Sequence, residues 1–203
     1  MVLKVTLIGH SYVRRLMEYR VANEESPFSM SVDGVEMRLS FVHQGGCGYE
    51  FFKHSEPHKA EIVRSCPDII LVILGGNGVS SEAAIPTVST QMRKFHEWLR
   101  LACPSAIIIA AECEPRYNLN MCDHKGNPVE SYRLRRNAFN QAIKRLRMNR
   151  LKDYIFRTAN YLNHREFYGH NGIHLNSRGN RFYWGMIRDC LGKVIDKFDI
   201  RQD

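Results

Sequence analysis

Two features that would place the chain in a special class are missing from its sequence. No apolar run approaches the roughly 18 residues needed to cross a bilayer, and the six cysteines form no Cys-x-x-Cys pair. Lys4 lies inside the first apolar segment, which is untypical of a signal peptide. We therefore expect no membrane partner, no signal peptide and no zinc site or disulfide framework. The expected location is intracellular, cytoplasmic or nuclear, either as a separate protein or as a domain of a larger one.

Linker-like segments rich in proline, glycine and serine are also missing. We therefore expect residues 1–203 to form a single domain. The proportions of 44% hydrophobic and 25% charged residues are typical of a soluble globular protein. No motif implies a metal or organic cofactor. The net charge of +8 permits a polyanionic partner such as nucleic acid but does not establish one.

The first periodic stretch predicts a strand, a tight turn and a helix. A short apolar run over residues 5–8 ends at Gly9, and Ser11 then opens a segment with helical spacing. A serine at such a junction places its hydroxyl at the carboxyl end of a strand, which suits a nucleophile. The plainer interpretation is that Ser11 caps the helix.

Two later strands also end in glycine-rich segments. An alternating strand over residues 36–42 runs into Gly45 and Gly46. A continuous apolar strand over residues 68–74 is typical of a central parallel strand covered on both faces, and it leads to Asn77.

The remaining segments complete an α/β pattern. Strands alternating with helices imply a doubly wound, mainly parallel sheet of about five strands with helices on both faces. Right-handed crossovers bring the carboxyl ends of the first three strands to one edge, so Ser11, Gly46 and Asn77 should converge there. Further strands are expected at residues 106–111 and 154–158, helices at 57–64, 85–99 and after 176, and a loop at 23–34.

The residues at this edge have the chemistry of acyl transfer, which needs a nucleophile, a base and donors for the oxyanion. The Ser11 hydroxyl can attack, and three donors are available from the N–H groups of Ser11 and Gly46 and the side-chain amide of Asn77. His174, in a loop before the last helix, is the candidate base. Taken singly, these are a cap, two turn residues and a surface histidine. Their order and topology together favour an active site.

These residues resemble the four motif blocks of the SGNH hydrolase superfamily, also called GDSL-type esterases and lipases, which has a flavodoxin-like fold. The resemblance implies that Ser11 is the nucleophile and His174 the base. It also implies that Ser11, Gly46 and Asn77 form the oxyanion hole. The overall pattern is similar to SGNH domains associated with animal transposable elements. The blocks are Gly9-His10-Ser11, Gly45-Gly46, Gly75-Gly76-Asn77-Gly78 and Asn171-Gly172-Ile173-His174-Leu175.

Three positions depart from the family pattern. His10 replaces the aspartate before the serine, and Gly78 replaces the aspartate after the block-three asparagine. Asn171 replaces the aspartate of the triad. Its amide oxygen can accept a hydrogen bond from His174 and hold the tautomer, but it brings no charge. Some family members work with a Ser–His dyad, so the loss of the aspartate need not abolish activity.

A basic segment over residues 133–150 introduces a second kind of function. Its apolar stripe of Phe139, Ile143 and Leu146 is typical of an amphipathic helix whose basic face is solvated. The other interpretation is a phosphate-binding face. The side chains considered for such a face are Arg133, Arg135, Arg136, Lys144 and Arg147.

Two functional hypotheses follow. The leading one is a serine ester hydrolase that acts on a small or short-chain acyl ester, such as an acetyl ester, with a Ser–His dyad and Asn171 in place of the triad aspartate. The alternative is a catalytically weakened SGNH-fold binding module that contacts nucleic acid or another polyanion through the basic helix.

Overall fold

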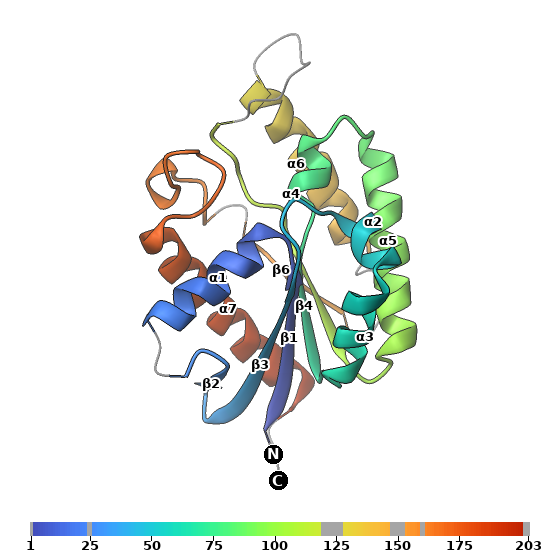
Figure 1. Cartoon of the computed structure of the whole chain (residues 1–203), viewed down its shortest axis with the longest axis vertical. Coiled ribbons are helices and arrows are strands. Elements are labelled where there is room, and N and C mark those ends of the chain that lie inside the picture. Colours follow the sequence, from blue (N-terminus) through green and yellow to red (C-terminus); the bar gives the residue numbers. More distant parts are fainter. Residues whose placement is uncertain (1, 24–25, 119–127, 147–152, 159–160, 201–203) are drawn as a thin grey trace.

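The strands of the protein, in a computed structural model, form a sheet of order β2-β3-β1-β4-β5-β6 (Figure 1). The structure describes residues 2–23, 26–118, 128–146, 153–158 and 161–200. Its strands are β1 (Leu3–Gly9), β2 (Ser29–Val32), β3 (Val35–His43), β4 (Ile69–Ile73), β5 (Ile107–Ala111) and β6 (Asp153–Phe156). Its helices are α1 (Ser11–Asn23), α2 (Tyr49–His54), α3 (Glu56–Arg64), α4 (Gly76–Ser80), α5 (Ile85–Ala102), α6 (Pro128–Leu146), α7 (Ser177–Phe198) and the short 3₁₀ helix η2 (Arg165–Phe167).

Neighbouring strands in this sheet run parallel, except that β2 pairs antiparallel with β3. Gly9, the last residue of β1, pairs with His43 of β3 and Ile73 of β4. The three strands therefore end at the same level of the sheet. This confirms the expected doubly wound, mainly parallel α/β class, and it explains why the segments that follow these strands meet at one edge.

The sheet has six strands in the described residues, where about five were expected. The additional strand, β2, lies in the stretch 23–34 that was interpreted as a loop. Asp33 and Gly34 form the turn between β2 and β3, and their φ angles are +51° and +82°. Asp-Gly is a strong signal for such a two-residue hairpin because both central residues need positive φ. The residues of β2, Ser-Met-Ser-Val, do alternate polar and apolar side chains, but the prediction missed the strand because its serines lie among residues typical of turns.

Two apolar cores pack against the sheet, one on each face. Helices α1 and α7 cover the first face, where Leu3, Val5 and Leu7 of β1 are buried (Figure 1). Helices α2, α3, α5 and α6 cover the second face, against Ile8 of the same strand. Strands β4 and β5 are buried along their whole length, which is the physical origin of their continuous apolar sequences.

None of the described helices combines the length and the hydrophobicity that a transmembrane segment requires.

Candidate active site

Ser11 and His174 are brought together at the carboxyl edge of the sheet. Ser11 is the first residue of α1 and is separated from the end of β1 by His10 alone, whereas His174 lies in the loop between η2 and α7. The Ser11 Oγ is 2.9 Å from His174 Nε2. The two residues are 163 positions apart in the chain, so this pair depends on the fold.

Neighbouring side chains fix the loop that carries His174. The hydroxyl of Tyr12, which is buried, donates to the carbonyl of Ile173 at 2.5 Å. The side chain of Asn176 caps α7 by accepting from the Gly179 N–H at 2.8 Å. The loop that carries His174 is therefore anchored on both sides of this residue, to α1 at Ile173 and to the start of α7 at Asn176.

The amide of Asn171 contacts His174 with its nitrogen. Its Oδ1 accepts from the backbone N–H groups of Ile173 at 3.0 Å and His174 at 3.1 Å. These two donors orient the amide, because a flipped amide would turn its NH₂ group toward them. Its Nδ2 is then 2.9 Å from His174 Nδ1. The expectation that the amide oxygen accepts from His174 was therefore wrong.

This amide orientation selects the tautomer of the neutral imidazole. An NH₂ group can only donate, so Nδ1 of His174 must accept and the ring proton lies on Nε2. The hydrogen bond to Ser11 then runs from Nε2 to Oγ. The ring would have to shift its proton to Nδ1 before Nε2 could take a proton from the serine.

His174 and His10 are both neutral at physiological pH. Burial, followed by the positive charges of nearby arginines, Arg15 first, lowers the pKa of His174 to about 4. Complete burial, with the charge of Arg116 second, lowers the pKa of His10 to about 3. His10 is 1% exposed and its Nδ1 accepts from the Tyr12 N–H at 3.4 Å. The position that holds an aspartate in the resembled family is thus occupied by an uncharged ring.

Asn77 is held in a fixed orientation by a buried arginine. Its Oδ1 accepts from Arg116 at 2.9 Å, and Arg116 also donates to the Ser80 hydroxyl at 2.8 Å. The Asn77 Nδ2 donates to the carbonyl of Cys47 at 2.9 Å. The amide nitrogen is therefore directed toward the loop that contains Gly46. One of its two N–H bonds donates to Cys47, and the other does not take part in this contact.

Sequence reasoning missed Arg116, which is only 8% exposed. A signal was present in its position. It follows β5 in the segment Glu112–Arg116, on the same sheet edge as Ser11 and Asn77. Charged residues just beyond the carboxyl end of a parallel strand are typical of ligand sites in open α/β sheets.

The glycine-rich loop after β3 is tied to both neighbouring segments. Gln44 donates its backbone N–H to the carbonyl of Gly9 at 3.1 Å, which joins the loop to the turn before Ser11. The bond between Asn77 and Cys47 joins it to α4. Gly46 has a φ of +74°, which residues with a Cβ rarely adopt. These bonds connect the three segments that carry Ser11, Gly46 and Asn77.

The glycine at the family's second aspartate position has a steric reason. A Cβ on Gly78 would lie 2.7 Å from Cγ1 of Val88 in α5. An aspartate at this position would therefore push into α5.

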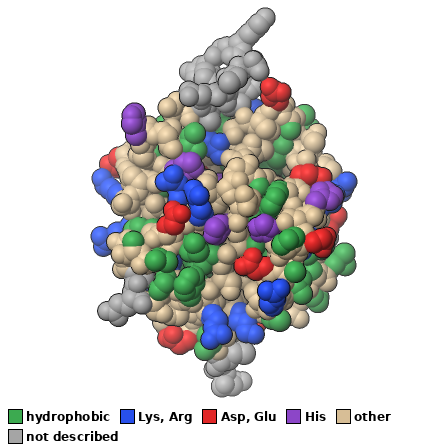
Figure 2. Space-filling view, in the orientation of Figure 1, with side chains coloured by type: hydrophobic (Ala, Val, Ile, Leu, Met, Phe, Trp, Pro, Cys, Tyr) green, Lys and Arg blue, Asp and Glu red, His purple; other side chains and the backbone are tan. Residues whose placement is uncertain are grey.

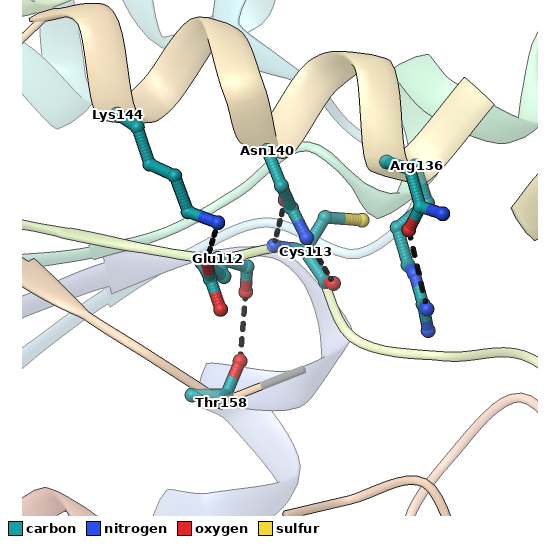
Figure 3. Close-up of polar contacts among 7 residues, drawn as sticks. Glu112, Cys113, Arg136, Asn140, Lys144 and Thr158 are labelled. Atoms are coloured by element: carbon teal, nitrogen blue, oxygen red, sulfur yellow. Dashed lines mark hydrogen bonds and ion pairs between the residues drawn. The ribbon is translucent and has the colours of Figure 1, made fainter. Parts of the chain in front are cut away.

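Three of the basic residues of α6, Arg133, Arg135 and Lys144, have close partners within the protein. Arg133 pairs with Glu130, Arg135 donates to the carbonyls of Val79, Ser81 and Ala83, and Lys144 lies 3.3 Å from Glu112. Figure 3 shows Lys144 and Asn140 reaching from α6 to Glu112 and Cys113, just beyond β5. Arg136 lies 3.5 Å from Asn137, and Arg147 falls outside the described residues. Binding of a polyanion by this helix stays a prediction.

The charge on the face seen in Figure 2 is mixed. Lysine and arginine side chains are interspersed with aspartate and glutamate, and they do not gather into one large basic patch on this face. This distribution differs from the continuous basic stripe that is typical of nucleic-acid-binding surfaces.

Comparison with known proteins places the fold. No protein-family profile matches the chain, and no curated protein matches it. Among solved structures it is similar to a carbohydrate esterase family 3 protein from Talaromyces cellulolyticus, with 17% identity, coverage of 96% of this chain and 99% of that one, and a TM-score of 0.67. It is also similar to an acetyl esterase mutant with an acetate ion. The identity is 16%, the match covers 98% of this chain and 100% of that one, and the TM-score is 0.65. A third similar structure is a GDSL-like lipase from Bacteroides thetaiotaomicron. The identity is 12%, the match covers 96% of this chain and 88% of that one, and the TM-score is 0.62. The chain therefore has the fold of the SGNH and GDSL-type esterases.

Proposed function

We propose that the protein is an SGNH-type serine ester hydrolase that acts on small or short-chain acyl esters such as acetyl esters. The observation that carries this proposal is the 2.9 Å contact between Ser11 Oγ and His174 Nε2 at the carboxyl edge of the sheet. Solved structures with this fold include proteins named as an acetyl esterase and a carbohydrate esterase, which supports an ester substrate.

The roles of the residues follow from the chemistry of acyl transfer. Ser11 Oγ attacks the carbonyl carbon while its proton passes to His174 Nε2. The N–H groups of Ser11 and Gly46 and the Nδ2 of Asn77 stabilise the oxyanion. The tetrahedral intermediate then collapses, and His174 returns the proton to the leaving alcohol. Water, activated by the same histidine, hydrolyses the acyl enzyme.

Asn171 makes the first proton transfer slow. The reactive tautomer has its proton on Nδ1, where it would face the NH₂ group of Asn171, and two donors would then oppose each other. A serine protease with asparagine in place of its triad aspartate loses about 10⁴ in rate through the same wrong tautomer. We expect weak but measurable turnover.

Hydrolysis of p-nitrophenyl acetate tests the proposal. The wild type should turn it over slowly, and Ser11→Ala should reduce the rate to that of buffer. A fluorophosphonate should label the wild type but not Ser11→Ala, and His174→Ala should suppress the labelling, because the hydroxyl needs its base. Equal labelling of the wild type and Ser11→Ala, or equal turnover by both, would contradict the assignment of Ser11.

A second candidate function is a weakened SGNH-fold module that binds a polyanion: the orientation of the Asn171 amide supports weakened catalysis, and the net charge of +8 permits a polyanionic partner. If α6 carries this function, affinity for RNA or DNA should fall steeply with salt, because each neutralised phosphate releases counterions. Reversing the charge of Arg136 should weaken binding further. A salt-independent or undetectable interaction would exclude this candidate. The relationship to SGNH domains of animal transposable elements is likewise proposed from the motif pattern alone.

A further inference from the structure

A cavity of about 500 Å³ lies beside His174, and the reaction steps described above assign it no ligand. Its walls come from α1, from the segment after β5 and from the loop before α7. Among the described residues that line it, none is acidic and only Leu175 has an apolar side chain. The lining residues are Arg15, Asn118, Gly169, His170, Asn171, His174 and Leu175. A lining of this composition favours a polar ligand.

Arg15 gives the cavity its charge. The neighbouring Arg14 is exposed and lies 3.6 Å from Glu18, with which it forms an ion pair. The Nε of Arg15 is instead buried and has no hydrogen-bond partner within the described part of the chain. Because this Nε is buried, it does not itself open into the cavity, but Arg15 as a residue lines it. Carboxylate and phosphate groups are the preferred acceptors of a guanidinium.

The wall of the cavity opposite α1 is held in place without a ligand. Arg165 donates to three successive carbonyls of the loop, those of residues 168–170, at 3.0 to 3.2 Å. The Tyr117 N–H donates to the Gly172 carbonyl at 2.7 Å, which joins the segment of Asn118 to the same loop. The polar groups of the cavity are therefore largely positioned before anything binds.

The position of the cavity relates it to the leaving group. In acyl transfer His174 donates its proton to the leaving oxygen, so the alcohol part of the ester lies against this ring. His174 lines the cavity, whereas Gly46 and Asn77, which are proposed to hold the oxyanion, do not. The alcohol part is thus the part of the substrate that can enter.

We propose that this cavity binds the alcohol part of the ester and that Arg15 selects alcohols that carry an anionic group, either a carboxylate or a phosphate. This inference rests on the proposed function. Asn118 and His170 line the same cavity and supply further polar contacts to the anion.

Kinetics with matched acetyl esters test this selectivity. The neutral ester is phenyl acetate, and the two anionic esters are 4-acetoxybenzoate and 4-acetoxyphenyl phosphate. The measured quantity is the ratio of kcat/KM for an anionic ester to that for phenyl acetate. A change in the pKa of His174 caused by the substitution affects both esters equally and therefore cancels in this ratio. Arg15→Gln should lower this ratio about tenfold or more, and Arg15→Lys should lower it less, because it keeps the charge but loses the guanidinium fork.

Arg14→Gln is the matched control, because it removes an equal charge one residue away from a side chain that does not line the cavity. It should leave the ratio within about twofold. An equal fall in both glutamine variants would overturn the proposal, since it would reflect general electrostatic attraction. Monophenyl succinate, which carries its anion on the acyl side, should show no dependence on Arg15; dependence as large as for the other anions would also overturn it.

A binding measurement separates this inference from the proposed hydrolysis. Calorimetric titration of Ser11→Ala with 4-acetoxybenzoate and with 4-acetoxyphenyl phosphate requires no turnover, and adding Arg15→Gln should raise the Kd about tenfold. If no ester is hydrolysed but this Arg15-dependent binding is found, the proposed function fails and the anion site stands. If esters are hydrolysed and binding is unaffected by Arg15→Gln, the anion site fails and the hydrolase stands.

Discussion

The two halves of the candidate site are built differently. On the proposed donor half, Asn77 is oriented by the buried Arg116, and its amide nitrogen donates to the carbonyl of Cys47 in the glycine-rich loop. On the base half, Asn171 is exposed, and backbone N–H groups turn its amide so that a donor faces His174. If the proposed roles hold, the comparison separates a half whose donors are held in place from a half in which one side chain holds the candidate base in the unreactive tautomer.

Asn171→Asp should have the largest effect. A carboxylate can accept from the same backbone N–H groups with one oxygen and from His174 Nδ1 with the other, which restores the reactive tautomer. We expect kcat/KM for p-nitrophenyl acetate to rise at least a hundredfold, toward a limit of about 10⁴.

The pH profile of the same variant provides an independent readout. The pKa of His174 is about 4, so wild-type activity should persist to low pH and fall only near that value. A neighbouring carboxylate favours the charged imidazolium and raises this pKa, so the acidic limb should move to higher pH. Asn163→Asp, at an exposed asparagine of the preceding loop, is the control. An unchanged rate and an unmoved limb in Asn171→Asp would contradict the tautomer argument.

Removing a donor tests the other half. In the Asn171→Asp background, Asn77→Ala should lower kcat by about 10² to 10³, the usual cost of one oxyanion donor. KM should change little, because the oxyanion forms only in the transition state. Asn137→Ala, on the exposed face of α6, should have no effect. A loss of less than about threefold from Asn77→Ala would show that the donor half is not used as proposed.

The buried His10 predicts an acid-sensitive fold. Its pKa is 6.5 when unfolded and about 3 when folded, so only the unfolded chain takes up the proton between these values. Stability from this group is complete above pH 6.5 and is lost as the pH falls toward 3, by about 3 kcal/mol at pH 4. Denaturant unfolding at pH 7 and pH 4 measures this loss, which should be smaller in His10→Gln. The same loss in both proteins would assign it to other groups.

Arg116 should show the smallest effect of the four. Arg116→Gln removes the charge that orients Asn77, and we expect kcat to fall about tenfold with little change in KM. Loss of its charge also raises the pKa of His174, so the acidic limb of the pH–rate profile should move to higher pH. Ser80→Ala removes the other partner of Arg116 and should leave kcat and the limb unchanged. A change in KM and stability alone would mean that Arg116 has only a structural role.

Much of the fold could be predicted from local patterns. The continuous apolar sequence of β4 and the alternation in β3 indicated the parallel sheet, and the glycines after them marked its carboxyl edge. The missed strand β2 had both an Asp33-Gly34 turn signal and a short alternation, but its serines were interpreted as part of a loop. Of the candidate site, Ser11 and His174 could be named from motif order, although their hydrogen bond could not.

The sequence by itself determined the α/β class and the order of strand ends, because hydrophobic period and glycine position are properties of short segments. Only the tertiary structure decided which way the Asn171 amide points, since that depends on two backbone N–H groups of a folded loop. It also decided that Arg116 orients Asn77 and that Arg15, rather than Arg14, enters the cavity. The partners of Arg116 are far from it in the chain, and Arg14 and Arg15 are adjacent but differ in their surroundings. The partners of Asn171 are only two and three residues away, but they orient its amide only in the backbone conformation of the folded loop.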